Sequence, residues 1–95
     1  MFKAPSTDEY KRHILVSVKN LINENPRITV NKLKGQMKTK YFAQEEDVDG
    51  ALAALLNVFC CISVYKVPNR DATHLNSKPS SMWVDGMPNT QLQMA

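Results

Sequence analysis

Cysteine and glycine are scarce in this sequence. The two cysteines are adjacent, Cys60 and Cys61, so they form no disulfide framework, and no second Cys or His cluster completes a tetrahedral zinc site. Both thiols are predicted to be small buried hydrophobes at an element boundary. The three glycines form no phosphate-cradling loop, and no nucleophile elbow or spaced set of metal ligands is present. Neither an enzyme nor a cofactor is expected.

Long apolar runs are also missing. No run approaches the ~18 residues of a membrane span, and the first residues, MFKAPSTDEYK, lack the apolar core of a signal peptide. We therefore expect a cytoplasmic protein without a membrane partner.

Charge is unevenly distributed along the chain. The 95 residues, 43% of them hydrophobic, fit one domain, with a net charge of +3 and a pI near 9.0. Residues 1–42 hold nine bases and three acids, whereas residues 43–95 hold three bases and six acids. A polyanion should prefer the first half.

Apolar periodicity predicts a first helix that ends at Asn25-Pro26. Ser6 stands three residues before Glu9, which is the spacing of a capping box at a helix start. Apolar side chains then recur at steps of three and four, at Tyr10, Ile14, Val18, Leu21 and Ile22, with Leu15 widening the stripe. Lys19 falls off this stripe, and His13 is predicted to be a surface or boundary histidine.

A short second helix follows at once. Thr29 is its predicted N-cap, and Val30, Leu33 and Met37 give it one apolar face. The seven residues KTKYFAQ then separate Met37 from the third helix.

The third helix is predicted from about Glu45 to Phe59. Its apolar stripe is Val48, Leu52, Leu55 and Phe59. The opposite face carries Glu46, Asp49, Gly50, Ala53 and Asn57 and is therefore small and anionic.

The remaining chain predicts a hairpin. CISVYKV, with β-branched residues in near alternation, predicts a strand over about 62–67. Residues 68–81 are polar and predict a long loop, after which 82–84 form a short strand that pairs back on the first. Trp83 is expected to cover the hairpin by packing on the first strand.

The order of these elements, with ENPRITVNKLKGQM leading into the second helix, resembles the winged helix-turn-helix superfamily. The resemblance implies an α+β fold of three helices followed by a two-stranded β-hairpin wing. It implies an N-terminal arm at 1–6, a winged-helix domain at 7–84 and a flexible tail at 85–95. In such domains the third helix enters the major groove and the wing touches phosphate. The seven-residue connection departs from the usual helix-turn-helix length of about three or four.

The acids at the start of the third helix argue against deep insertion into a groove. Glu45, Glu46 and Asp47 favour the helix through its free N–H groups and dipole, by about 0.3–1 kcal/mol each. The same charges near phosphates are repelled.

We therefore predict a small transcriptional regulator that binds double-stranded DNA mainly through phosphates, as a dimer because one module contacts one half-site. The predicted contacts on and after the second helix are Asn31, Lys32, Lys34, Lys38, Lys40 and Tyr41. The predicted base-edge contacts are Gln44, Asp49 and Asn57. The predicted wing contacts are Arg70, His74 and Lys78.

An alternative function belongs to another class. The acidic, alanine-rich face of the third helix would dock a basic protein partner or a second copy of the chain, since small side chains permit close approach. In that case the domain would not bind DNA.

Overall fold

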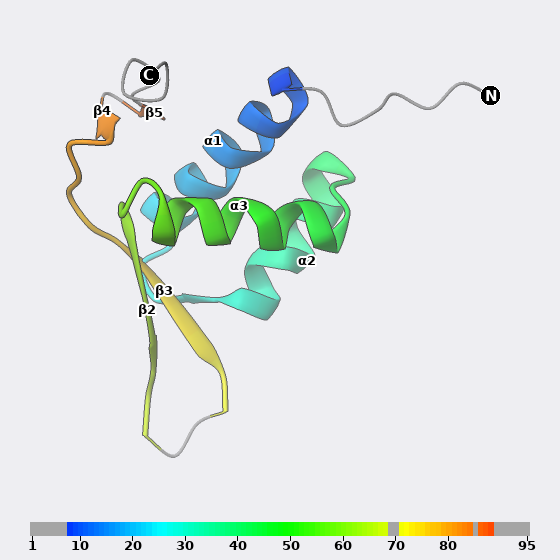
Figure 1. The fold of residues 1–95 in the computed structure, drawn as a ribbon. Coiled ribbons are helices and arrows are strands. Elements are labelled where there is room, and N and C mark those ends of the chain that lie inside the picture. Colours follow the sequence, from blue (N-terminus) through cyan, green and yellow to red (C-terminus); the bar gives the residue numbers. More distant parts are fainter. Residues whose placement is uncertain (1–7, 69–70, 85, 89–95) are drawn as a thin grey trace.

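The computed structural model describes residues 8–68, 71–84 and 86–88 (Figure 1). Three helices lie around one core, and an antiparallel hairpin extends away from them. The helices are α1 (Asp8–Glu24), α2 (Val30–Tyr41) and α3 (Glu45–Asn57). The strands are β1 (Ile28–Thr29), β2 (Ile62–Lys66), β3 (Thr73–Ser77), β4 (Trp83–Val84) and β5 (Met87–Pro88). The protein is a small α+β chain whose layout is compatible with a winged helix.

α1 follows its predicted apolar stripe. Ile14, Val18, Leu21 and Ile22 are all buried in the common core. The helix ends where predicted, because Pro26 cannot continue it. Both the backbone N–H and the side-chain amide of Asn25 donate to the Leu21 carbonyl at 3.0 Å. The capping residue Ser6 lies outside the described residues.

α2 is longer than predicted. Its N-cap is confirmed, since the Thr29 hydroxyl accepts from the Lys32 N–H at 3.1 Å. The helix runs on to Tyr41 and ends only at Phe42, which adopts a left-handed backbone with φ 56°. The connection to α3 is therefore residues 42–44, and the predicted seven-residue connection is wrong. Nothing in KTKY opposes a helix, and the turn is made by a left-handed residue that is not glycine.

α3 presents the predicted faces with one adjustment. Val48, Ala51 and Leu55 are buried, whereas Leu52 is only partly buried at the edge of the core. All five residues of the predicted opposite face, Glu46, Asp49, Gly50, Ala53 and Asn57, are exposed. The helix ends at Asn57, two residues before the predicted Phe59, which is buried beyond the helix end.

The partner strand of β2 is not the predicted one. β2 pairs with β3 over the register Ile62↔Ser77 to Lys66↔Thr73, and β3 lies inside the segment predicted as loop. Of the five β3 residues only Leu75 is a buried hydrophobe, so the strand has almost no apolar alternation to reveal it. β1 adds to the other edge of β3 with Ile28 opposite Leu75, which gives the order β1-β3-β2.

Residues 83–84 pair with residues 87–88 and not with β2. Gly86, at φ 78°, supplies the positive dihedral of the turn between them. β5 thus lies in the segment predicted as tail, of which residues 85 and 89–95 are outside the described chain. Trp83, 9% exposed, packs edge-on against Phe59 with ring centroids 5.5 Å apart. The indole therefore packs just beyond the end of α3, in the same core cluster as Ile62 of β2.

The cysteines differ in environment. Cys61 is buried, as predicted, but Cys60 is exposed in a left-handed conformation with φ 53°. Burial raises the pKa of the Cys61 thiol. Since the thiolate is the nucleophile, iodoacetamide should alkylate Cys60 in the native protein and Cys61 only after unfolding in urea. Peptide mass spectrometry would check this; equal rates at both positions in buffer would contradict the placement of Cys61.

Within the described residues, no helix combines the length and apolar character needed to cross a bilayer.

Candidate nucleic-acid interface

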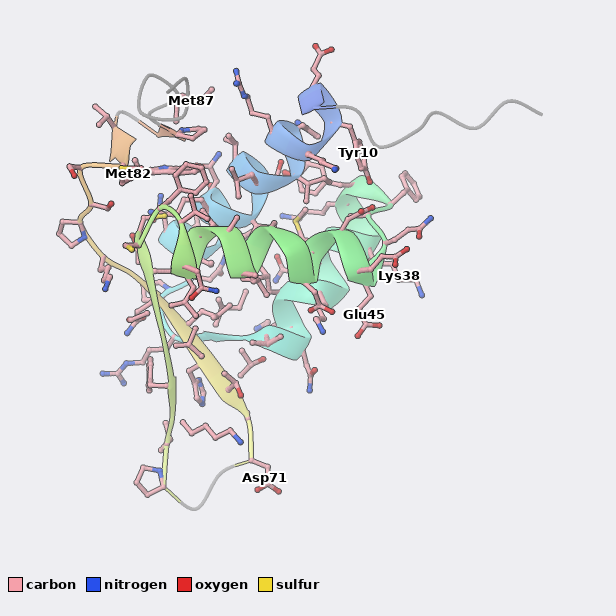
Figure 2. All side chains as sticks on the ribbon, in the orientation of Figure 1. Tyr10, Lys38, Glu45, Asp71, Met82 and Met87 are labelled. Atoms are coloured by element: carbon pink, nitrogen blue, oxygen red, sulfur yellow. The ribbon has the colours of Figure 1, made fainter. Side chains whose placement is uncertain are left out.

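A groove of about 600 Å³ lies between α2 and the start of α3. We call it the α2–α3 groove, and its lining comprises Asn31, Lys34, Gly35, Lys38, Phe42, Ala43, Gln44 and Glu45. Asn31, Lys34 and Lys38 are three and four residues apart, so they share one face of α2. Figure 2 shows Lys38 and Glu45 at the same end of the molecule, next to the turn between the helices.

Lys34 forms two ion pairs across this groove. Its Nζ lies 2.8 Å from Asp49 Oδ1 and 3.1 Å from Glu45 Oε2. Hydrogen bonds to Asp49 and then Glu45 raise the pKa of Lys34. A third acid, Asp47, accepts a 3.3 Å hydrogen bond from the Tyr10 hydroxyl of α1. Three of the four acids in the first turns of α3 therefore contact another helix: Glu45 and Asp49 contact α2, and Asp47 contacts α1. They also stabilise the start of α3.

The ion pair between Lys34 and Asp49 should contribute modestly to stability. The Asp49 side chain is 55% exposed, so solvent screens the attraction. We expect a coupling of about 0.2–1 kcal/mol in a double-mutant cycle of Lys34→Met and Asp49→Asn, measured by urea unfolding. A matched cycle of Lys32→Met with Asp49→Asn should give no coupling. Equal coupling energies in the two cycles would contradict the ion pair between Lys34 and Asp49.

The lysines of α2 do not form one patch. Lys38 and Lys40 are two positions apart, so at about 100° per residue they lie on nearly opposite sides of the helix. Lys32 and Lys40 are exposed but do not line the groove. Tyr41 contacts α1, with its ring 5.6 Å from His13, an exposed helix-surface histidine as predicted.

The predicted base-edge residues are also separated. Gln44 lines the groove, and its side chain makes no capping hydrogen bond to α3. Asp49 is engaged by Lys34. Asn57 is exposed at the other end of α3, about 20 Å away along 13 residues at 1.5 Å each. The structure therefore brings Asn31, Lys34, Lys38 and Gln44 together and leaves Asn57 outside.

The two predicted wing residues that the structure describes, His74 and Lys78, occupy different places. Arg70 lies outside the described residues. His74 is on β3 and not in a loop: it stacks on Tyr65 at 5.5 Å, and its Nδ1 is 3.0 Å from the Arg27 carbonyl. Lys78 follows β3 at the end of the hairpin nearest the helices, where its N–H donates to the Cys61 carbonyl. Figure 2 labels Asp71 at the other end of the hairpin, which we call the hairpin tip.

Two exposed residues next to these sites were not singled out from the sequence. Lys66 ends β2 and is an exposed cation beside the hairpin tip. Phe42 is 86% exposed at the turn between α2 and α3. The sequence carries no clear signal for the exposure of Phe42, because neighbouring Tyr41 and Ala43 are also apolar or aromatic and Ala43 is buried.

Among the described residues, no group of three His, Cys, Asp or Glu side chains is placed to hold a metal ion. A scan against protein-family models, a search of curated proteins and a search of solved structures each found no match.

Proposed function

We propose that this chain is a winged-helix DNA-binding regulator that contacts duplex DNA chiefly through phosphates. The observation that carries the proposal is α2, a three-residue turn and α3, followed by the antiparallel β2–β3 hairpin in the position of a wing. The short turn has the length that a helix-turn-helix requires. A module of this size covers one half-site, so the regulator would act as a dimer.

Charge neutralisation makes approach to DNA feasible. Lys34 offsets Glu45 and Asp49, so those carboxylates repel phosphate less than free acids would. Lys38 is then the exposed groove cation without a carboxylate partner in the described chain. Asn31 and Gln44, on either side of it, carry amides suited to base edges. Lys66 would serve the wing.

The test is the salt dependence of binding to a fluorescently labelled random duplex. The logarithm of the affinity should fall linearly with the logarithm of the salt concentration, with about 0.9 of slope for each phosphate contact. Lys38→Ala should reduce the slope by about 0.9 without changing the preference among sequences. Lys40→Ala removes the same charge from another side of α2 and is the matched control.

In this titration, absence of binding at micromolar protein and low salt would overturn the proposal. Equal slope changes for Lys38→Ala and Lys40→Ala would instead show that net charge, and not the groove, determines binding.

A second function is favoured by the exposed face of α3. No Lys or Arg occurs in Glu45–Asn57, and Gly50 and Ala53 leave this face with small side chains. Such a face would dock a basic protein or a second copy of the chain closely. Ala53→Arg should then abolish self-association in analytical ultracentrifugation. If DNA instead binds at α2, the same variant should retain its affinity for the duplex. A monomeric wild type at high concentration would contradict the self-docking form.

A further inference from the structure

Lys19 is a buried cation on α1. The residue is 4% exposed, although lysine is almost never fully buried without a partner of opposite charge. Its Nζ donates to Asn23 Oδ1 at 2.7 Å and to Ser77 Oγ at 2.8 Å, and it lies 6.0 Å from the centroid of the Trp83 ring. In the described part of the chain, no carboxylate forms an ion pair with it. Within these residues, the hydrogen bonds that compensate the buried charge come from neutral side chains.

A hollow of about 390 Å³ lies against this ammonium. Its wall includes Lys19, Asn23, Ser77, Lys78 and Trp83, and among the described residues none that lines it is acidic. It lies between the second half of α1, the end of β3 and the β4–β5 hairpin. In Figure 1 that hairpin is on the opposite side of the molecule from the turn between α2 and α3. The hollow is thus separate from the α2–α3 groove.

The wall is rich in hydrogen-bond donors. Because the Ser77 oxygen and the Asn23 carbonyl oxygen already accept from Lys19, the Ser77 hydroxyl hydrogen and the Asn23 NH₂ group are the polar hydrogens left to these side chains. The Trp83 indole N–H is buried and has no acceptor among the residues that the structure describes. Lys78, exposed at the rim, adds a second positive charge. Within the described chain, the wall offers these donors no negatively charged hydrogen-bond acceptor.

We propose that this hollow binds a small anion bearing a phosphate or carboxylate group. The anion would lie beside Lys19, accept hydrogen bonds from the Asn23 amide and the Ser77 hydroxyl, and be closed over by Lys78. Charge-assisted hydrogen bonds of this kind are roughly twice as strong as neutral ones. Because the anion would contact α1, β3 and the β4–β5 hairpin, its binding would fasten the C-terminal hairpin onto the helical core.

The titration of Lys19 is consistent with this geometry. Burial lowers the pKa of Lys19, and the Cys61 thiol is the other titratable group that acts on it. An anion in the hollow would act in the opposite direction and favour the charged amine.

Trp83 reports on the hollow directly, since it is the single tryptophan of the chain and forms part of the wall. Its emission should be followed during titration with sodium phosphate, with sodium succinate and with sodium chloride at matched ionic strength. A fourth titration with random duplex DNA separates a free small anion from a nucleic-acid phosphate. We expect a saturable change with phosphate or succinate that chloride and DNA do not produce.

Lys19→Met keeps the aliphatic stem and should weaken the affinity by at least about tenfold, equivalent to about 1.4 kcal/mol. Lys78→Ala changes an exposed residue, so this variant should fold even if loss of the buried amine disturbs folding. It should weaken the affinity for the anion several-fold. Lys40→Ala, on α2, should leave the affinity unchanged. Circular dichroism checks that each variant is folded, and the Lys78→Ala result carries the test if Lys19→Met is unfolded.

No saturable change beyond that of chloride would overturn the proposal, as would equal affinities in wild type and Lys78→Ala. A response to duplex DNA alone would also overturn it, because the site would then belong to nucleic-acid binding. The proposed DNA-binding function is tested at Lys38 on another face and can fail or stand separately.

Discussion

Leu55→Ala is expected to lower the free energy of unfolding by about 2–5 kcal/mol. Leu55 is 0% exposed in the last turn of α3, and it belongs to the core that α1, α2 and the sheet share. Removing its branched side chain loses transfer free energy and leaves a cavity that rigid neighbours fill only in part. Since small domains are stable by about 5–15 kcal/mol, urea unfolding would show a large shift in midpoint.

Two variants on the same helix are the controls. Leu52→Ala should lower the free energy of unfolding clearly less, because Leu52 is only partly buried. The apolar periodicity predicts Leu52 in the middle of the buried stripe, and the structure corrects this prediction. Ala53→Ser, on the exposed face, should change stability by less than about 0.5 kcal/mol. Similar losses in all three variants would mean that the rotation of α3 about its axis is wrong.

Trp83→Ala is expected to cost about 3–5 kcal/mol. The indole is 9% exposed, contacts Phe59 edge-on and lies beside the Lys19 ammonium. Its removal would uncover the end of α3 and admit water to a buried charge. Thermal and urea unfolding followed by circular dichroism would measure the loss.

Trp83→Phe separates packing from chemistry at this position. Phenylalanine retains an aromatic edge for Phe59 and removes an indole N–H that has no acceptor in the described part of the chain, so it should cost much less than alanine. A Trp83→Ala variant as stable as wild type would show that the β4–β5 hairpin does not cover the core.

The helices were predictable because the residues that determine where a helix forms are close together in the sequence. The steps of three and four in α1 and α3 fix which side faces the core, and Thr29 and Pro26 mark the boundaries. The end of α2 was not predictable, because Phe42 takes a left-handed conformation that propensity assigns to glycine or asparagine. β3 was missed because Leu75 is its one buried apolar residue, and its place is set by pairing with both β1 and β2.

The candidate site was predictable only in composition. The sequence indicates that lysines crowd α2, but the pairing of Lys34 with Glu45 and Asp49 depends on how α2 packs against α3. Helical periodicity alone separates Lys38 from Lys40, and this consequence is clear once α2 is known to reach Tyr41. Lys19, off the apolar stripe of α1, is buried because β3 and Trp83 close over it from distant parts of the chain.

The most direct test of the proposed function is nuclear magnetic resonance of ¹⁵N-labelled protein titrated with a random DNA duplex. Amide shifts should concentrate at Asn31, Lys38 and Gln44 and near the hairpin tip, and should diminish as salt is added. The outer face of α3 around Ala53 and Asn57 should shift less. A spectrum unchanged by duplex, or shifts confined to that outer face, would contradict the account.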